Sequence, residues 1–362
     1  MPLEAYIQPR EGAATNARRS QDMMCASVYM EASMRPASDM RERSPLAARP
    51  SPTVTYSDLP AGGLPPGTLA AFGFGAQATA PGDDPRWLRV ALEPLAEARP
   101  ELWTIEGEVT YGREGDLSWS RGGGWLYAAV ECDEADHGGP EGAAKHAYEL
   151  LSAFVAQAPE HHVQRIWNYL GEINAGAGDD ERYKQFCTGR IAGMGEVFAQ
   201  GFPAASAIGH HADQGLLQVY LLATDREGTR VENPRQVSAW QYPRQYGRTP
   251  PSFARATLLP ADDVLAISGT AAVVGHASAH TGDLSAQLAE TRRNLDALLA
   301  NGGLPEGFDA RAPLKAYVRH PDDAAVVQAF AQAHWPQAPL VLLHGDICRE
   351  ELLVEIDGWR YR

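Results

Sequence analysis

The chain has 362 residues, 44% of them hydrophobic, which suffices for one large domain or two domains with buried cores. Its formal net charge of −15 argues against a nucleic acid or an anionic membrane as a partner. The apolar runs are far shorter than a membrane span and the N-terminus has no apolar signal core, so we expect a cytoplasmic protein. Because no C-x-x-C pair is present, we expect free thiols rather than disulfides or zinc ligands at Cys25, Cys132, Cys187 and Cys348.

Residues 1–52 differ in composition from the rest of the chain. They are rich in Arg, Ser, Pro and Ala and contain few aliphatic side chains. Such a segment buries too little apolar surface to fold by itself, so we predict a disordered N-terminal extension, or a start site assigned too far upstream. Order is expected to begin near Thr53.

The segment that follows, up to residue 230, predicts several strands and two helices. Short aliphatic and aromatic runs bounded by Gly and Pro are typical of strands. Residues 141–156 place apolar side chains at a 3.6-residue period, and residues 182–199 predict a second helix. The predicted strands are 69–75, 87–95, 103–112, 125–131, 161–174 (ending in a loop), 202–209 and 216–224.

The second half of the chain predicts the same kinds of element. Residues 264–275 predict a strand pair, and residues 285–303 an amphipathic helix that ends at glycines. The remaining predicted elements are a strand (314–319), a helix with Asp in its first turn (321–335) and two closing strands (339–343 and 352–356).

One order of elements occurs twice along the chain: strand, acidic turn, helix, Pro-led strand, polar turn, strand. Aligned on their prolines, the two copies bring Tyr220 close to Glu355, with a one-residue difference in the turn. A repeated order of this kind indicates a structural duplication. We therefore predict an α+β fold of two similar domains, residues 53–230 and 231–362, each a β-sheet with helices packed on one face.

Glu355 places a carboxylate inside the last apolar strand. In a strand, Val354 and Ile356 point to one face and Glu355 to the other. Two interpretations stay open on these residues alone: a Glu on the wet face of a half-exposed strand, or a partly buried acid. In the second case, desolvation raises the pKa of Glu355 and keeps it protonated near neutrality, fit to donate a proton.

The second half resembles the YjgF/RidA family. The resemblance rests on PSFARA (251–256), ISGTA (267–271), Gln287 and Asn294, LKAYVR (314–319) and LLVEIDG (352–358). It implies that family's β-sheet with two helices on one face and its trimer with ligand pockets between subunits. Two such units in one chain could form such a pocket internally, so we expect a monomer or a small homo-oligomer.

A second resemblance covers most of the chain from about Thr53. The sequence is similar to the chorismatase family, which includes the 3-hydroxybenzoate synthases. The similar strings are NYLGEIN (168–174), RYKQFCTGR (182–190), ENPRQVSAWQYPRQYG (232–247), PSFARA, ISGTA, VGH (274–276) and GDICREELLVEIDG (345–358).

The chorismatase resemblance implies an enzyme that removes pyruvate from the enol ether of chorismate. One branch of the family hydrolyses chorismate to a dihydroxycyclohexadiene carboxylate, and others produce 3-hydroxybenzoate, in some cases with 4-hydroxybenzoate. The reaction needs an acid that protonates the methylene carbon and requires no metal or redox cofactor. By position within VEIDG, Glu355 is implied to be that acid. Cys348 stands at the position that accompanies 3-hydroxybenzoate production, although a free Cys is more often a small buried hydrophobe.

The resemblance also implies which residues bind the two carboxylates of chorismate. Arg offers a rigid bidentate fork for a carboxylate. The implied substrate-binding residues are Tyr183, Arg190, Tyr242 and Arg255, with Gly269, Thr270 and Ala271 lining the pocket and Arg235 and Arg244 as spare candidates. Without the family, Arg190 could lie on a solvated helix face and both tyrosines could be packing residues.

Three functions are therefore compared. The first is a pyruvate-releasing chorismatase, and the second is an imine deaminase of the general YjgF/RidA type, which needs a small pocket with one Arg. The third is a ligand sensor without activity, against which Glu355 argues. The several Arg and aromatic positions between residues 183 and 255 favour the first. The adjacent histidine pairs, 161–162 and 210–211, have no acidic third ligand at metal spacing, so we predict no metal site.

Overall fold

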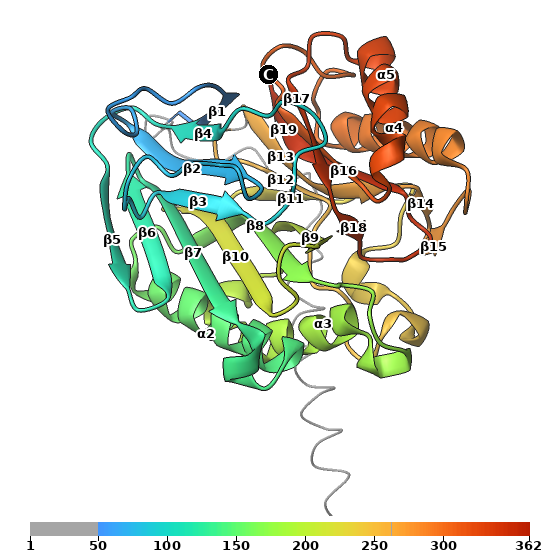
Figure 1. The fold of residues 1–362 in the computed structure, drawn as a ribbon, viewed down its shortest axis with the longest axis horizontal. Coiled ribbons are helices and arrows are strands. Elements are labelled where there is room, and N and C mark those ends of the chain that lie inside the picture. The colour runs from blue at the N-terminus through green and yellow to red at the C-terminus, as the bar shows by residue number, and fades with distance from the viewer. Residues whose placement is uncertain (1–49, 262) are drawn as a thin grey trace, which may run out of the picture. The chain divides into compact units, whose positions relative to one another are not determined.

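Strands predominate over helices in the part of the chain that the computed structural model describes, residues 50–261 and 263–362 (Figure 1). In the first half, two α-helices, α2 (Pro140–Gln157) and α3 (Arg182–Gly193), accompany the strands. The strands are β1 (Thr53–Tyr56), β2 (Thr68–Phe74), β3 (Trp87–Val90), β4 (Glu101–Thr104), β5 (Thr110–Glu114), β6 (Leu117–Gly122), β7 (Trp125–Asp133), β8 (His162–Gly171), β9 (Ala204–His210) and β10 (Leu216–Thr224).

The second half also contains two α-helices, α4 (Leu284–Asn301) and α5 (Ala324–His334). Its strands are β11 (Thr229–Val231), β12 (Ala256–Leu258), β13 (Val264–Ala271), β14 (Val273–Val274), β15 (Ala277–Ser278), β16 (Leu314–Val318), β17 (Leu340–His344), β18 (Asp346–Ile347) and β19 (Val354–Tyr361). Short 3-10 turns lie at η2 (Glu134–His137), η3 (Gly178–Asp180), η4 (Glu196–Phe198), η5 (Ala239–Gln241), η6 (Arg244–Tyr246) and η7 (Pro321–Asp323).

The strands form three larger sheets and one two-stranded ribbon, β14-β15. The four-stranded sheet has the order β1-β4-β2-β3, the seven-stranded sheet β18-β9-β8-β10-β7-β6-β5, and the six-stranded sheet β11-β12-β13-β19-β16-β17. Helix α2 packs on β7 and β10 and against α3, while α4 packs on β13 and β19 and α5 on β16 (Figure 1). The predicted α+β class is confirmed.

The two halves have matching strand orders. In the first half β8 pairs in parallel with β9 and antiparallel with β10, and in the second half β16 pairs in the same way with β17 and β19. Because Arg165 pairs with Leu222 and Leu314 with Gly358, Tyr220 corresponds to Ile356, one residue from Glu355. The repeated order of elements is therefore present in the structure, while the predicted register is wrong by one residue, because the two copies match without the one-residue difference in the turn.

The central core lies where the three larger sheets meet. Phe72 and Trp103 come from the four-stranded sheet, Trp167 from the seven-stranded sheet, and Trp359 from the six-stranded sheet. The Trp103 ring lies 5.2 Å from that of Trp167 and 5.7 Å from that of Trp359, measured between centroids. A second core fills the space between the six-stranded sheet and helices α4 and α5. None of the described helices is long and apolar enough to cross a lipid bilayer.

Several predicted elements have different bounds in the structure, among them the strands predicted over 87–95 and 352–356, which are β3 (Trp87–Val90) and β19 (Val354–Tyr361). The strand predicted over 103–112 is divided into β4 and β5, because Gly107 adopts a positive φ of 99° in the turn between them. The helix predicted over 182–199 ends at Gly193, where Met194 turns to an extended conformation. The polar link before the last strand contains β18, which leaves the second half and pairs with β9 of the first. Its short polar sequence carries no strand signal, since the pairing is supplied by a distant segment.

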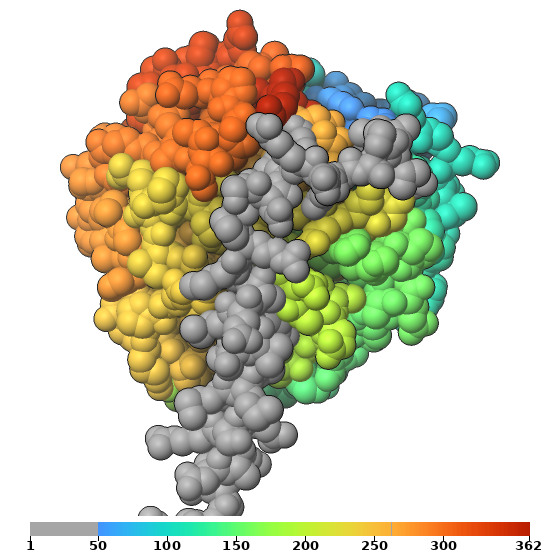
Figure 2. All heavy atoms as spheres, turned by 180° about the vertical axis from the view of Figure 1, so that it is seen from behind, coloured from blue at the N-terminus to red at the C-terminus, as the bar shows by residue number. Residues whose placement is uncertain are grey.

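The predicted N-terminal extension lies outside the described residues except for its last three. Ser51 donates a hydrogen bond to Asp263 over 2.7 Å, and the Pro52 carbonyl accepts one from Tyr361 over 2.7 Å. Of the described residues, 50–198, 202–261 and 263–362 belong to one compact unit. Seen from behind, residues of the first half, drawn green, and of the second half, drawn yellow to red, share one face (Figure 2).

Candidate functional site

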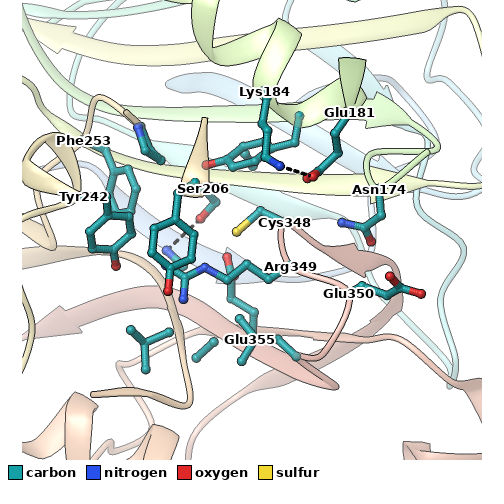
Figure 3. Close-up of a pocket in the computed structure, with 18 of the residues that line it drawn as sticks. Asn174, Glu181, Lys184, Ser206, Tyr242, Phe253, Cys348, Arg349, Glu350 and Glu355 are labelled. Atoms are coloured by element: carbon teal, nitrogen blue, oxygen red, sulfur yellow. Dashed lines mark hydrogen bonds and ion pairs between the residues drawn. The ribbon is translucent and has the colours of Figure 1, made fainter. Parts of the chain in front are cut away.

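A cavity of about 300 Å³ lies between the two halves of the chain (Figure 3). Tyr242 and Phe253 stand on one side of it, and Asn174 and Glu350 on the opposite side (Figure 3). Most of the residues that the sequence implies for the site line this cavity. They come from α3 (Tyr183 and Arg190), from the segment before β12 (Tyr242 and Arg255), from β13 (Gly269 and Ala271) and from the end of the chain (Cys348 and Glu355).

Glu355 is a buried carboxyl group in the cavity wall. Val354 and Ile356 pack into the core beneath α4 and α5, so the alternation of β19 turns Glu355 to the opposite face, where it is only 5% exposed. Burial, and next the charge of Asp357, raise the pKa of Glu355 to about 8. The second interpretation of this residue, a buried acid, is therefore confirmed, and Glu355 carries its proton at neutral pH. Its catalytic role stays a prediction.

Gly269 leaves room for the Glu355 carboxyl. A Cβ atom at position 269 would lie 1.7 Å from Oε1 of Glu355, so no other residue fits there without displacing the acid. Ala271 pairs with Glu355 across the β13–β19 ladder and also lines the cavity. Thr270, between them, points away from the cavity, and its hydroxyl donates to the Ser268 carbonyl over 3.0 Å. Gly269 and Ala271 thus line the cavity as expected, and the side chain of Thr270 does not.

Arg190 reaches the cavity because α3 packs unusually close to α2. A Cβ atom on Gly189 would lie 1.9 Å from the Glu141 carbonyl oxygen, and one on Gly193 would lie 2.3 Å from that of Lys145. The glycines therefore allow the two backbones to touch and fix the rotation of α3. Arg190 is 3% exposed, its guanidinium lies over the Tyr148 ring, and its Nε and Nη2 atoms have no hydrogen-bond partner. A solvated helix face is thus excluded for Arg190.

Arg255 is the second buried guanidinium of the cavity. It is 6% exposed and donates from Nη2 to the Tyr242 hydroxyl over 2.7 Å and to the Val237 carbonyl over 2.8 Å. Its Nε atom has no hydrogen-bond partner. Tyr242 is therefore more than a packing residue, since it orients Arg255.

Arg349 is a third guanidinium in the cavity, which the sequence analysis missed. It lies over the rings of Tyr246, 4.0 Å from the centroid, and Tyr242, at 5.0 Å. Its Nη1 atom donates to the His276 carbonyl over 2.9 Å and to the Ser278 hydroxyl over 3.1 Å. The only sequence signal was its position directly after Cys348, and the fold back onto Tyr246 depends on a distant loop.

The three cavity arginines share one electrostatic property. Among the described residues, no carboxylate lies within ion-pair distance of Arg190, Arg255 or Arg349. Arg190 and Arg255 are buried and Arg349 is half-buried, and an unpaired guanidinium group that is removed from water is costly unless an anion binds to it. The spare candidates differ: Arg235 pairs with Glu290, and Arg244 pairs with Asp179 over 2.6 Å in an exposed position. Neither lines the cavity.

Cys348 and Tyr183 meet in the wall near Glu355. Burial, and next the charge of Glu355, raise the pKa of Cys348 to about 12, so its thiol is neutral. Burial also holds the pKa of Tyr183 well above its usual value. A neutral thiol is a poor nucleophile. Cys348 therefore contributes a small, weakly polar side chain to the cavity wall and no nucleophile. Cys132, Cys187 and Cys348 are free thiols, as predicted, while Cys25 lies outside the described residues.

Comparison with known proteins agrees with this geometry. The family model "Chorismatase FkbO/Hyg5-like, N-terminal" matches residues 101–223. A 3-hydroxybenzoate synthase of Streptomyces hygroscopicus is 35% identical over 289 residues, which cover 74% of this chain and 83% of that protein. The chain belongs to the chorismatase family. The family resemblance drawn from the sequence strings is thereby confirmed.

Two further chorismatases support the assignment. A chorismatase of Streptomyces rapamycinicus is 35% identical over 280 residues, covering 72% of this chain and 82% of the relative. A crystal structure of a chorismatase matches with a TM-score of 0.75 and 29% identity, over 86% of this chain and 99% of that one. The similarity to a solved chorismatase therefore extends over both halves of the fold.

Proposed function

We propose that this chorismatase removes pyruvate from chorismate and forms 3-hydroxybenzoate. The proposal rests on the contents of one cavity. It holds a buried, protonated carboxyl group, that of Glu355, together with three guanidinium groups that have no carboxylate partner, those of Arg190, Arg255 and Arg349. Chorismate is a dianion with an enol ether that is cleaved by acid. The name of the Streptomyces hygroscopicus relative, a 3-hydroxybenzoate synthase, supports the same product.

The acid step uses the proton of Glu355. It is transferred to the methylene carbon of the enol ether, which leaves an oxocarbenium ion on the side chain. The bond between the ring carbon and the ether oxygen then breaks, and its electrons complete the carbonyl of pyruvate. Arg190, Arg255 and Arg349 are proposed to hold the two carboxylates, so that the methylene carbon lies against Glu355.

The ring then forms the aromatic product without water. The neighbouring ring hydroxyl attacks this ring carbon as its bond to the pyruvate oxygen breaks, which forms an epoxide, and the hydroxyl proton returns to Glu355. The epoxide is an isomer of hydroxybenzoate, so opening it and shifting one ring hydrogen gives the product. Water must be kept from the ring for this route. The neutral, weakly polar thiol of Cys348 and the small residues Gly269 and Ala271 support it.

Two alternatives remain as outcomes of the test. A hydrolytic chorismatase would add one water and give a dihydroxycyclohexadiene carboxylate, and a YjgF/RidA-type deaminase would leave chorismate unchanged. The pure protein is incubated with chorismate, pyruvate is quantified, and the ring product is separated by chromatography. Pyruvate with 3-hydroxybenzoate supports the proposal, and 4-hydroxybenzoate is measured as a second product. If the dihydroxycyclohexadiene carboxylate is the sole ring product, the protein is a hydrolytic chorismatase and the assignment of 3-hydroxybenzoate as product is wrong. If no pyruvate is released, the proposed function is wrong.

We also propose that the chain consists of two YjgF/RidA-like domains, residues 53–230 and 231–362, with the second supplying the acid. The matching pairing of β8 and β16 with their neighbours supports this division. Because residues of both halves of one chain line the cavity, a monomer or a small homo-oligomer suffices for activity. The three free thiols suit a reducing compartment such as the cytoplasm.

A further inference from the structure

Asp357 is a fully buried carboxylate directly beside the acid. It follows Glu355 by two residues in β19, so the two side chains point to the same face of the sheet. Four donors meet on its Oδ2 atom: Ser206 Oγ at 2.7 Å, Arg165 Nη2 at 2.9 Å, Tyr317 hydroxyl at 2.9 Å and Trp167 Nε1 at 3.1 Å. Asp357 does not line the cavity, and the acid step described above does not use it.

Ser206 connects Asp357 to the backbone beside Glu355. Its hydroxyl donates to Asp357 and accepts a hydrogen bond from the Gly269 N–H over 2.9 Å. Ser268 and Gly269 form a bulge in β13, since Ile267 pairs with Gly358 and Thr270 with Ile356. Within the bulge, the Gly269 N–H finds its acceptor in Ser206 instead of in the ladder. Asp357 therefore holds, through Ser206, the glycine that makes room for the Glu355 carboxyl.

The charges around Glu355 come from several elements. The negative charge is that of Asp357 in the same strand. The positive charges are those of Arg165 in β8, Arg255 before β12 and Arg349 before β19. The neutral groups are the Cys348 thiol and the Tyr317 hydroxyl of the paired strand β16. Behind Asp357, Lys315 lies 3.9 Å from Oδ1 and pairs with Glu101 over 3.0 Å. Counted together, these groups carry four positive charges (Arg165, Arg255, Arg349 and Lys315) and two negative ones (Asp357 and Glu101), so removing the Asp357 charge raises their net charge from +2 to +3.

We propose that Asp357 is a positioning residue for the acid, acting through Ser206 and the Gly269 bulge and through its own charge on the same face as Glu355. This inference rests on the proposed role of Glu355 as proton donor. Asp357 itself touches no substrate.

The test is Asp357→Asn, read by the titration of Glu355. The amide oxygen can accept the same four donors, and its nitrogen can take the place of Oδ1, which has no hydrogen-bond partner. Infrared difference spectra, with Glu355→Gln subtracted, follow the protonated carboxyl band of Glu355 without substrate. We expect a midpoint near pH 8 in the unsubstituted protein and a shift toward acid of about one pH unit or more in the variant. The descending limb of kcat/KM for pyruvate release should shift by the same amount.

The matched control is Glu134→Gln, which removes a buried carboxylate from its ion pair with Arg182, outside the cavity. It should leave the Glu355 midpoint in place. A folded Asp357→Asn protein with an unchanged midpoint would overturn the inference. If the unsubstituted protein releases no pyruvate, the proposed function fails, while the infrared titration still decides whether Asp357 acts on Glu355.

Ser206→Ala tests the structural link if Asp357→Asn does not fold. It keeps the charge of Asp357 and removes the acceptor of the Gly269 N–H. We expect faster hydrogen exchange of the Gly269 amide and a loss of about 10- to 100-fold in kcat, with the pH limb unmoved. An unchanged exchange rate together with an unchanged kcat would exclude the link through Ser206.

Discussion

The carboxyl group of Glu355 occupies the space that a side chain at residue 269 would fill, 1.7 Å from the position of a Cβ atom on Gly269. Glu355 is held by its pairing with Ala271, and Gly269 lies in the adjacent bulge of β13 with its N–H on Ser206, so an added side chain would push the end of the Glu355 side chain out of place. Gly269→Ala is therefore expected to displace the acid and reduce pyruvate release about 100-fold, because a shift of about 1 Å has that effect on a reacting group. Steady-state kinetics with chorismate measure it, and the melting temperature should fall only slightly. Near-normal kcat would show that the acid does not depend on this contact.

Glu355→Gln keeps the shape of the acid and removes its proton. We expect the rate of pyruvate release to fall by about 10²–10⁴, the usual contribution of a general acid. Glu306→Gln, at an exposed position outside the cavity, is the matched control and should keep the normal rate. Single-turnover assays with chorismate measure both. Release by Glu355→Gln at the normal rate would remove this residue from the mechanism.

The raised pKa of Glu355 also predicts how stability changes with pH. Its folded value of about 8 lies above the ordinary value of 4.5, so between these pH values the folded protein holds one proton more than the unfolded chain. The stabilisation is fully present below about pH 4.5 and is lost as the pH rises through about 8, on the order of 5 kcal/mol. Glu355→Gln should therefore melt at a higher temperature than the unsubstituted protein at pH 9, with little difference at pH 5. An equal difference at both pH values would contradict the buried, protonated state.

The arginines are predicted to act on the substrate rather than on the fold. Replacing Arg190, Arg255 or Arg349 singly by Ala should lower kcat/KM for chorismate by about tenfold or more, because each loses a charge-assisted contact. At Arg190 and Arg255, removal of an unpaired buried charge should leave the melting temperature equal or higher. Arg311→Ala, at an exposed ion pair with Asp309, is the control for loss of one positive charge. Unchanged kcat/KM in all three variants would show that other residues bind the carboxylates of the substrate.

Much of the fold follows from local patterns in the sequence, and the site follows from them only in part. Helix α2 and strands β10 and β16 lie within a residue or two of their predicted bounds, since apolar periodicity is a local property. Strand β18 could not be predicted, because its partner is β9, far away in the sequence. The burial of Glu355 could not be predicted, because it depends on residues of the opposite cavity wall. The place of Arg349 in the cavity could not be predicted either, because it depends on contacts with the rings of Tyr242 and Tyr246. Contacts between distant segments decide these properties, and no local pattern encodes them.

Cys348 is predicted to influence the product more than the rate. Replacing its neutral thiol by the smaller Ala side chain makes room for a water molecule beside Glu355. We expect Cys348→Ala to keep releasing pyruvate and to form more of the dihydroxycyclohexadiene carboxylate or of 4-hydroxybenzoate. Chromatography of the products, with Cys187→Ala as the control for loss of a buried thiol, measures the change. A variant that still forms only 3-hydroxybenzoate would keep the product and discard this reason for it.

The most direct test of the account is the fate of chorismate with the purified protein. Pyruvate and the ring product are quantified in the same reaction, with Glu355→Gln protein as the blank. The account predicts one pyruvate for each chorismate consumed, with 3-hydroxybenzoate as the main ring product. Chorismate that remains intact with the unsubstituted protein, or pyruvate that appears equally fast with Glu355→Gln, would contradict it.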